Sequence, residues 1–339
     1  MLPYIKGKNM EYIISYNSQS KNLCFLELKK LNCNFKEIDS LSNEQSLINL
    51  DIDNEKLIKI INTKPIIFLR HIIKITKKFN KNYNKTDFFN TILNNLSKNL
   101  TFSIQFLSNI NKQDCSINIQ TLADELEKNN YILNVKQPEQ IISIYETQNT
   151  IMLGFGNENL NLSTFKGGAP HFSKKQEFVS RAEYKLLEAT NLTNLELSKI
   201  SSAADLGAAP GGWTKVLASK NINVHSIDPA HLSPEIKNIK NVKHFQMLTE
   251  EFLQKFNFTY DLIVNDMKMD ISLSTDIILS FYPRLNTNGY VIMTFKLAKN
   301  FTYSQIINQL KRLTEKYKLV LARQLFHNRS EITVVLKKL

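Results

Sequence analysis

The sequence is poor in cysteine and has no long apolar run. Its three cysteines, Cys24, Cys33 and Cys115, are odd in number and widely spaced. They therefore fit neither a zinc site nor a disulfide framework, and suit reduced thiols. The absence of a stretch of about 18 apolar residues predicts no membrane span, and the mixed charges of the first residues do not suit a secretory signal. We expect a cytoplasmic protein without a bound metal.

Acidic residues are also in deficit: 43 Lys and Arg face 31 Asp and Glu, which leaves a net charge of +12. This balance favours a polyanionic partner such as RNA, although many chains rich in Lys and Asn are basic without binding nucleic acid. The length suffices for two domains. A polar segment with Gly167, Gly168 and Pro170 has neither a helical nor a strand period, so we expect domains at residues 1–165 and 166–339.

The first domain is predicted to be a mixed α+β layer. Apolar residues recur at helical spacing and then alternate as in strands. Residues 12–16 and 23–28 fit a strand or a helix equally well. The remaining elements are expected to be helices at residues 86–100 and 121–130, and strands at residues 102–106, 131–135, 141–145 and 150–155.

The second domain is predicted to be α/β, with a Rossmann-like, mainly parallel sheet. A helix is expected over residues 180–190, because Ser180 suits an N-cap and Glu183 completes a capping box. Four strands, separated by helices, are expected at residues 203–206, 224–227, 262–265 and 290–295. The last two strands, 319–325 and 332–336, are joined by a loop too short for a parallel crossover, so we expect an antiparallel hairpin.

A glycine-rich turn follows the first of these strands and opens a helix. It comprises Asp205, Leu206, Gly207, Ala208, Ala209, Pro210, Gly211, Gly212 and Trp213. Small residues let the backbone approach a ligand closely. Asp228 ends the next strand, where a carboxylate accepts hydrogen bonds from the ribose of an adenosine moiety.

The turn favours S-adenosylmethionine (SAM) over nucleotide phosphates. A P-loop needs Lys after its last glycine, but Trp213 follows Gly212. The dinucleotide fingerprint is also unmet, because Ala209 holds the place of its second glycine. The carboxylate of Asp205 would repel a pyrophosphate, whereas it suits the ammonium group of SAM.

Charged residues mark the ends of two later strands. Asp266 follows residues 262–265 and Lys296 follows residues 290–295, and ligands of doubly wound sheets bind at such carboxyl ends. Together with Lys185 and Glu331, these residues resemble the Lys-Asp-Lys-Glu tetrad of FtsJ-like ribose 2′-O-methyltransferases. The resemblance covers residues 180–336.

The resemblance implies a reaction and a substrate class. Residues 323–334 are similar to the ending of one branch of this family, the THUMP-containing bacterial enzymes that methylate a cytidine ribose in large-subunit (23S) rRNA. This implies a ferredoxin-like and THUMP-like RNA-binding region in the first domain. The residues expected to position RNA around the site are Lys174, Lys175, Arg181, His327 and Arg329.

The chemistry gives each member of the tetrad a role. A ribose hydroxyl is a poor nucleophile until it loses its proton, so a base and in-line alignment are needed. Burial and a neighbouring cation lower a lysine pKa, which we expect from the pairing of Lys185 with Lys296. Lys296 is then the base, Lys185 steadies the oxyanion, Asp266 orients Lys296, and Glu331 holds both lysines.

The family's usual acidic residue after the third strand is missing here.

Four other functions are alternatives, and the residues disfavour the first two. Base N-methylation typically uses Asn/Asp-Pro-Pro-aromatic, but here Asn265 and Asp266 precede Met267 and Lys268. Pyrimidine C5 methylation needs a cysteine, yet every cysteine lies in the N-terminal half. An inactive RNA-binding scaffold would bind SAM without methyl transfer. A nucleotide-dependent oxidoreductase would instead bind NAD tightly.

Overall fold

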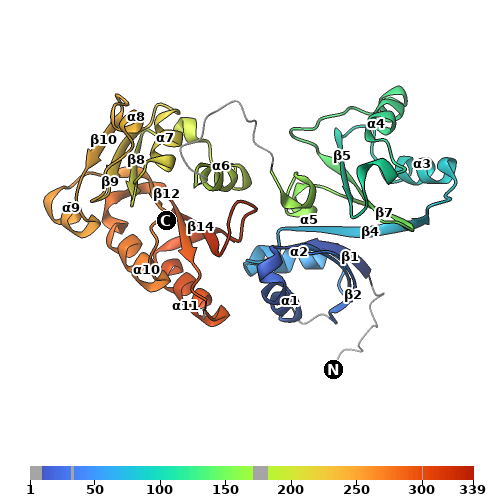
Figure 1. Cartoon of the computed structure of the whole chain (residues 1–339), viewed down its shortest axis with the longest axis horizontal. Helices are drawn as coiled ribbons and strands as arrows, with labels where there is room; N and C mark the ends of the chain where they lie inside the picture. The colour runs from blue at the N-terminus through green and yellow to red at the C-terminus, as the bar shows by residue number, and fades with distance from the viewer. Residues whose placement is uncertain (1–9, 32–33, 171–181, 300) are drawn as a thin grey trace. The chain divides into compact units, whose positions relative to one another are not determined.

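The computed structural model describes residues 10–31, 34–170, 182–299 and 301–339. The chain divides into two compact units, Met1–Pro170 and His171–Leu339 (Figure 1). The short helix η3, Lys166–Gly168, packs against strands of the first unit, so residues 166–170 lie with that unit, whereas the sequence-based boundary lies before residue 166. None of the helices in the described ranges is long and apolar enough to cross a membrane.

The N-terminal unit is built on one seven-stranded sheet. Its strands are β1 Met10–Ser15, β2 Lys36–Ser42, β3 Gln45–Leu50, β4 His71–Asn80, β5 Phe102–Ser108, β6 Gln140–Glu146 and β7 Thr150–Gly156, and its α-helices are α1 Lys21–Lys29, α2 Asn54–Thr63, α3 Lys85–Leu93, α4 Ile119–Lys128 and α5 Glu158–Asn161. The strand order is β2-β3-β1-β4-β7-β6-β5. The run β1-α1-β2-β3-α2-β4, with antiparallel neighbours β2-β3-β1-β4, has ferredoxin-like topology.

Strand β4 links the two halves of this sheet, because its first residues pair with β1 and its later ones with β7. Two sequence-based predictions are corrected here. The helix predicted over residues 86–100 ends at Leu93, followed by Asn94 and Asn95, whose side chains favour helix ends. The strand predicted at residues 131–135 is a single bridge, since the Asn134 side chain accepts hydrogen bonds from two following backbone N–H groups and turns the chain. A THUMP-like character of this unit stays a prediction.

The C-terminal unit confirms the Rossmann-like α/β prediction. Its strands are β8 Ser202–Leu206, β9 Asn223–Ile227, β10 Val242–Phe245, β11 Tyr260–Asn265, β12 Leu285–Lys296, β13 Tyr317–Arg323 and β14 Glu331–Lys338, and its α-helices are α6 Ala182–Leu192, α7 Gly212–Ala218, α8 Pro234–Lys237, α9 Thr249–Lys255, α10 Ile271–Ser280 and α11 Tyr303–Thr314. The order β10-β9-β8-β11-β12-β14-β13 is parallel through β12, and β14 is antiparallel to both neighbours.

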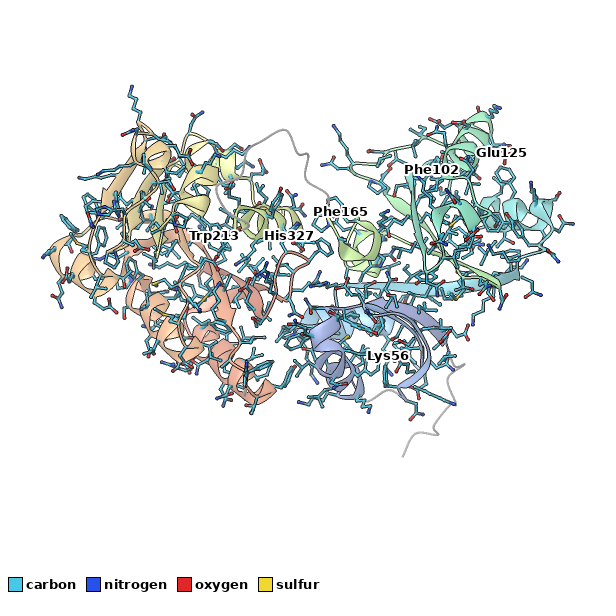
Figure 2. The ribbon with its side chains drawn as sticks, viewed as in Figure 1. Lys56, Phe102, Glu125, Phe165, Trp213 and His327 are labelled. Carbon is cyan, nitrogen blue, oxygen red and sulfur yellow. The ribbon has the colours of Figure 1, made fainter. Side chains whose placement is uncertain are left out.

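Strand order reverses between β8 and β11, so the carboxyl ends of these two strands flank the position where doubly wound sheets bind ligands. One face of the sheet buries apolar side chains against α6 and α7, including Leu186 and Trp213. A fully buried aliphatic side chain of this kind contributes about 1.5–3 kcal/mol. The Trp213 indole, labelled in Figure 2, also donates to the Ala182 carbonyl at 2.6 Å. Helix α6 is thereby held beside the glycine-rich turn.

Candidate active site

The glycine-rich turn needs glycine at two positions. Gly207 has a φ of +71° and Gly211 a φ of +116°, which L residues rarely adopt. A Cβ on Gly207 would lie 2.1 Å from Met267 Cγ, and one on Gly211 would lie 2.8 Å from Ile236 Cγ2. The turn therefore brings backbone close to the segment that follows β11, which begins with Asp266.

Asp228, after β9, braces the same turn. Its Oδ2 accepts a hydrogen bond from the Ala209 N–H at 3.0 Å, and its Oδ1 accepts one from the Ala230 N–H at 2.8 Å. A carboxylate has about four lone-pair positions, and this one is partly exposed. It can therefore accept ribose hydroxyls as well, which fits the nucleoside part of SAM.

Asp205 lies beneath the turn rather than on its surface. It is 2% exposed, and its Oδ2 accepts a hydrogen bond from the Thr214 hydroxyl at 2.7 Å. Thr214 also contacts the Ser226 hydroxyl at 2.8 Å. Burial raises the pKa of Asp205 to about 7. The carboxylate thus fastens α7 to the sheet, and its contact with the ammonium group of SAM stays a prediction.

This raised pKa predicts a pH-dependent stability. The folded state binds the Asp205 proton more tightly than the unfolded state does, so the stabilisation is complete below the unfolded pKa and is lost as pH rises through about 7. We expect wild type to lose on the order of 2–3 kcal/mol of unfolding free energy between pH 5 and pH 8 through this group. Urea denaturation of the SAM-free protein at both pH values measures it. Asp205→Asn should lack this component; an equal pH dependence in both proteins would contradict it.

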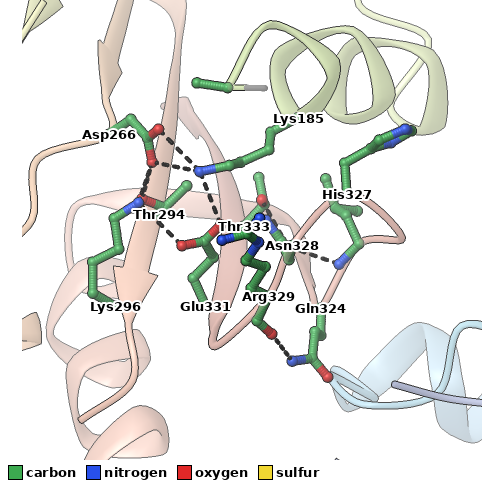
Figure 3. Close-up of polar contacts among 12 residues, drawn as sticks. Lys185, Asp266, Thr294, Lys296, Gln324, His327, Asn328, Arg329, Glu331 and Thr333 are labelled. Atoms are coloured by element: carbon green, nitrogen blue, oxygen red, sulfur yellow. Dashed lines mark hydrogen bonds and ion pairs between the residues drawn. The ribbon is translucent and has the colours of Figure 1, made fainter. Parts of the chain in front are cut away.

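The four predicted tetrad residues converge in a closed ring of charges (Figure 3). Lys185 Nζ lies 3.0 Å from Asp266 Oδ2 and 2.8 Å from Glu331 Oε1. Lys296 Nζ contacts Asp266 Oδ1 and lies 3.2 Å from Glu331 Oε2. Each amine therefore contacts both carboxylates, and each carboxylate contacts both amines.

Four elements, one helix and three strands, bring these side chains together. Lys185 lies on α6, and Asp266 directly follows β11. Lys296 ends β12 and pairs in register with Glu331, the first residue of β14. Directly opposite residues of antiparallel strands have Cβ atoms about 4.5–5.5 Å apart, so the pairing of β12 with β14 places one amine beside one carboxylate.

The ring holds its charges under partial burial. Exposed side-chain fractions are 10% for Lys185 and 20% for Lys296. Burial lowers the pKa of Lys185, but attraction to Asp266 and Glu331 outweighs it and leaves the pKa raised. Burial raises the pKa of Asp266, but attraction to Lys185 and Lys296 outweighs burial, so the pKa is lowered overall. The expected lowering of a lysine pKa is therefore wrong for Lys185, because attraction to two carboxylates outweighs the effect of burial.

Several neighbours of the ring were missed by sequence reasoning. The Thr294 hydroxyl donates to Asp266 Oδ1 at 2.7 Å; its place two residues before Lys296, on the same strand face, was an available signal. Glu188 and Tyr184 on α6 contact His327. Their signal was only a shared helix face.

The predicted RNA-contacting residues are only partly described. His327 and Arg329 lie in the turn before Glu331, and Arg329 is exposed. Lys174, Lys175 and Arg181 lie outside the described residues. Among the described residues no cluster of three or more His, Cys, Asp or Glu side chains could hold a metal ion.

Where the family's acidic residue is missing, the structure places an amide. Gln246 directly follows β10, and its Nε2 donates to the Pro229 carbonyl at 3.2 Å. Pro229 follows Asp228, so Gln246 borders the segment that would hold the nucleoside of SAM.

Comparison with known proteins shows which methyltransferases this chain is similar to. A family profile described as FtsJ-like methyltransferase matches residues 178–321. An uncharacterized protein of Methanocaldococcus jannaschii is 29% identical over 164 residues, which cover 47% of this chain and 47% of that protein. Ribosomal RNA large subunit methyltransferase M of Pseudoalteromonas translucida is 28% identical over 231 residues, covering 63% of this chain and 62% of that protein.

The match to these relatives is partial. The chain spans 47% of the length of the first relative and 62% of the second. Among solved structures, a putative ribosomal RNA methyltransferase from Plasmodium falciparum is 24% identical, covering 48% of this chain and 98% of that chain, with a TM-score of 0.36. That structural likeness is too low to carry an argument.

Proposed function

We propose that this chain, whose residues 178–321 are an FtsJ-like methyltransferase domain, transfers a methyl group from SAM to a ribose 2′-hydroxyl of RNA. The candidate substrate is 23S rRNA, because relatives over about three-fifths of the chain are named ribosomal RNA large subunit methyltransferase M. The observation that carries the proposal is the ring of two amines and two carboxylates beside the glycine-rich turn.

The turn and Asp228 suit SAM as the cofactor. The turn brings backbone to the switch point of the sheet, and Asp228 has lone pairs left for ribose hydroxyls. When bound, SAM supplies an activated methyl group. The protein then has to remove the hydroxyl proton and hold the oxygen in line.

The two lysines take different parts in this task. Lys185 is the more buried, and its raised pKa keeps it a cation, which suits stabilisation of an oxyanion. Lys296 is twice as exposed, so a substrate hydroxyl can reach its amine. We assign Lys296 as the general base. Asp266 accepts from the Thr294 hydroxyl and contacts Lys296, which fixes the direction of that amine.

Mapping ribose methylation tests the function directly. Ribosomal RNA from cells with and without the gene should differ at one 2′-O-methyl site in 23S rRNA. Purified protein and SAM should restore that site on RNA from the deletion strain, supplied either naked or as partly assembled subunits. SAM binding without methylation of either substrate would contradict the proposal and favour the scaffold alternative.

Lys174 and Lys175 should contact phosphates of the substrate RNA. Each such contact with single-stranded nucleic acid changes the slope of log affinity against log salt by about 0.7. Lys174→Ala with Lys175→Ala should therefore reduce the magnitude of that slope by about 1.4. Fluorescence anisotropy of labelled substrate RNA across a salt series measures it. An unchanged slope would place the RNA backbone elsewhere.

A further inference from the structure

A buried carboxylate on α6 holds the turn that leads into Glu331. Glu188 is 2% exposed. Its Oε1 accepts a hydrogen bond from the Phe326 N–H at 2.8 Å, and its Oε2 accepts one from the His327 N–H at 3.1 Å. The same Oε2 lies 2.7 Å from His327 Nδ1, a contact that suits the imidazole tautomer with its proton on Nδ1, because a carboxylate accepts hydrogen bonds. Three donors from two adjacent residues thus meet one carboxylate.

The same helix face also holds the imidazole by its ring. Tyr184 stacks on His327 with ring centroids 4.9 Å apart and an interplanar angle of 11°. Tyr184 and Glu188 are four residues apart on α6 and therefore neighbours on its surface. Lys185, the next residue after Tyr184, extends from this helix into the ring of charges, as Figure 3 shows.

The turn is braced internally as well, so its position is passed on to Glu331. Gln324 Nε2 donates to the Arg329 carbonyl at 2.8 Å. Asn328 Oδ1 accepts from the Leu325 N–H at 2.7 Å and from the Thr333 hydroxyl at 3.1 Å. A shift of this turn relative to α6 would therefore move Glu331 relative to Lys185.

We propose that Glu188 and His327 are positioning residues of the methyl-transfer site. Their contact fixes the separation between Lys185 on α6 and Glu331 at the start of β14, two groups that lie 2.8 Å apart. The inference rests on the proposed function, and it assigns neither residue a contact with the reacting atoms.

Kinetics of Glu188 variants test this role. A misplacement of about 1 Å at a catalytic group can cost about 100-fold in rate. Glu188→Ala should lower kcat to this extent and leave the KM for SAM within about threefold, the pattern of a lost transition-state interaction. Glu188→Gln should restore only part of the rate, because its amide oxygen still accepts from the Phe326 N–H while its Nε2 cannot accept from the His327 N–H.

Asp261→Ala is the matched control. The Asp261 carboxylate also binds backbone, because it accepts hydrogen bonds from the N–H groups of Ser201 and Ser202 at 3.0 and 3.1 Å. It lies near the start of β11, at the opposite end of the strand from Asp266. It should lower the melting temperature without lowering kcat per folded molecule. An equal loss of kcat in Glu188→Ala and Asp261→Ala would overturn the inference.

An activity-independent readout separates this inference from the proposed function. Loosening the turn should expose Lys185, so an amine-reactive reagent should label it severalfold faster in Glu188→Ala than in wild type or Asp261→Ala, as measured by peptide mass spectrometry. Unchanged labelling overturns the inference. Faster labelling in a protein that methylates no RNA supports the positioning contact, and the failure then falls on the proposed function.

Discussion

Replacing Lys296 by Met should lower the rate of methyl transfer by about 10²–10⁴-fold, the range for loss of a general base. The amine of Lys296 contacts both Asp266 and Glu331 and is the more exposed of the two lysines in the ring. The affinity for SAM should change little, because the proposed SAM contacts come from the glycine-rich turn and Asp228 and not from Lys296. Single-turnover transfer of labelled methyl to RNA, together with calorimetric titration of SAM, measures both quantities.

Lys296→Arg distinguishes a base from a structural cation. Arginine keeps a positive charge for the carboxylates but does not lose its proton in proteins. The variant should therefore fold and bind SAM yet remain as slow as Lys296→Met. Lys199→Met serves as control, since Lys199 is 73% exposed and pairs with Glu196. A rate near wild type in Lys296→Arg would refute the base assignment.

Replacing Gly207 by Ala should abolish measurable SAM binding and destabilise the C-terminal unit. The added Cβ would lie 2.1 Å from Met267 Cγ, and the φ of +71° is itself unfavourable by about 1–2 kcal/mol for an L residue. Either Met267 moves, which disturbs the neighbouring Asp266, or the turn opens. Calorimetric titration of SAM and thermal unfolding report the two effects.

A second substitution separates the two causes. Gly207→Ala combined with Met267→Ala removes the Cγ that the new side chain would meet but leaves the strained φ. The pair should recover the part of the unfolding free energy that comes from the clash, and Met267→Ala alone supplies the reference. A Gly207→Ala protein with normal stability and SAM affinity would show that the turn tolerates a side chain.

The fold of the C-terminal unit was largely predictable because its signals are local. Strand periodicity predicted the parallel strands, which the pairing of β11 with β8 and β12 confirms. The short loop before Glu331 predicted the antiparallel hairpin, which the pairing of β13 with β14 confirms. In the N-terminal unit, the alternation of apolar residues predicted a strand that a local polar side chain prevents. Asn134 turned an expected strand, because a side chain that satisfies backbone N–H groups competes with strand pairing.

By itself the sequence determined the glycine-rich turn and the strand ends that carry Asp266 and Lys296, since each depends on residues close together in the chain. The candidate tetrad followed from the resemblance to FtsJ-like methyltransferases. Only the tertiary structure decided how the charges balance. Lys185 and Asp266 are 81 positions apart, and their contact depends on α6 packing beside the turn. The contacts of Lys185 with Asp266 and Glu331 raise its pKa, where the sequence predicted a lowering. Charge interactions depend on distances that no local sequence pattern sets.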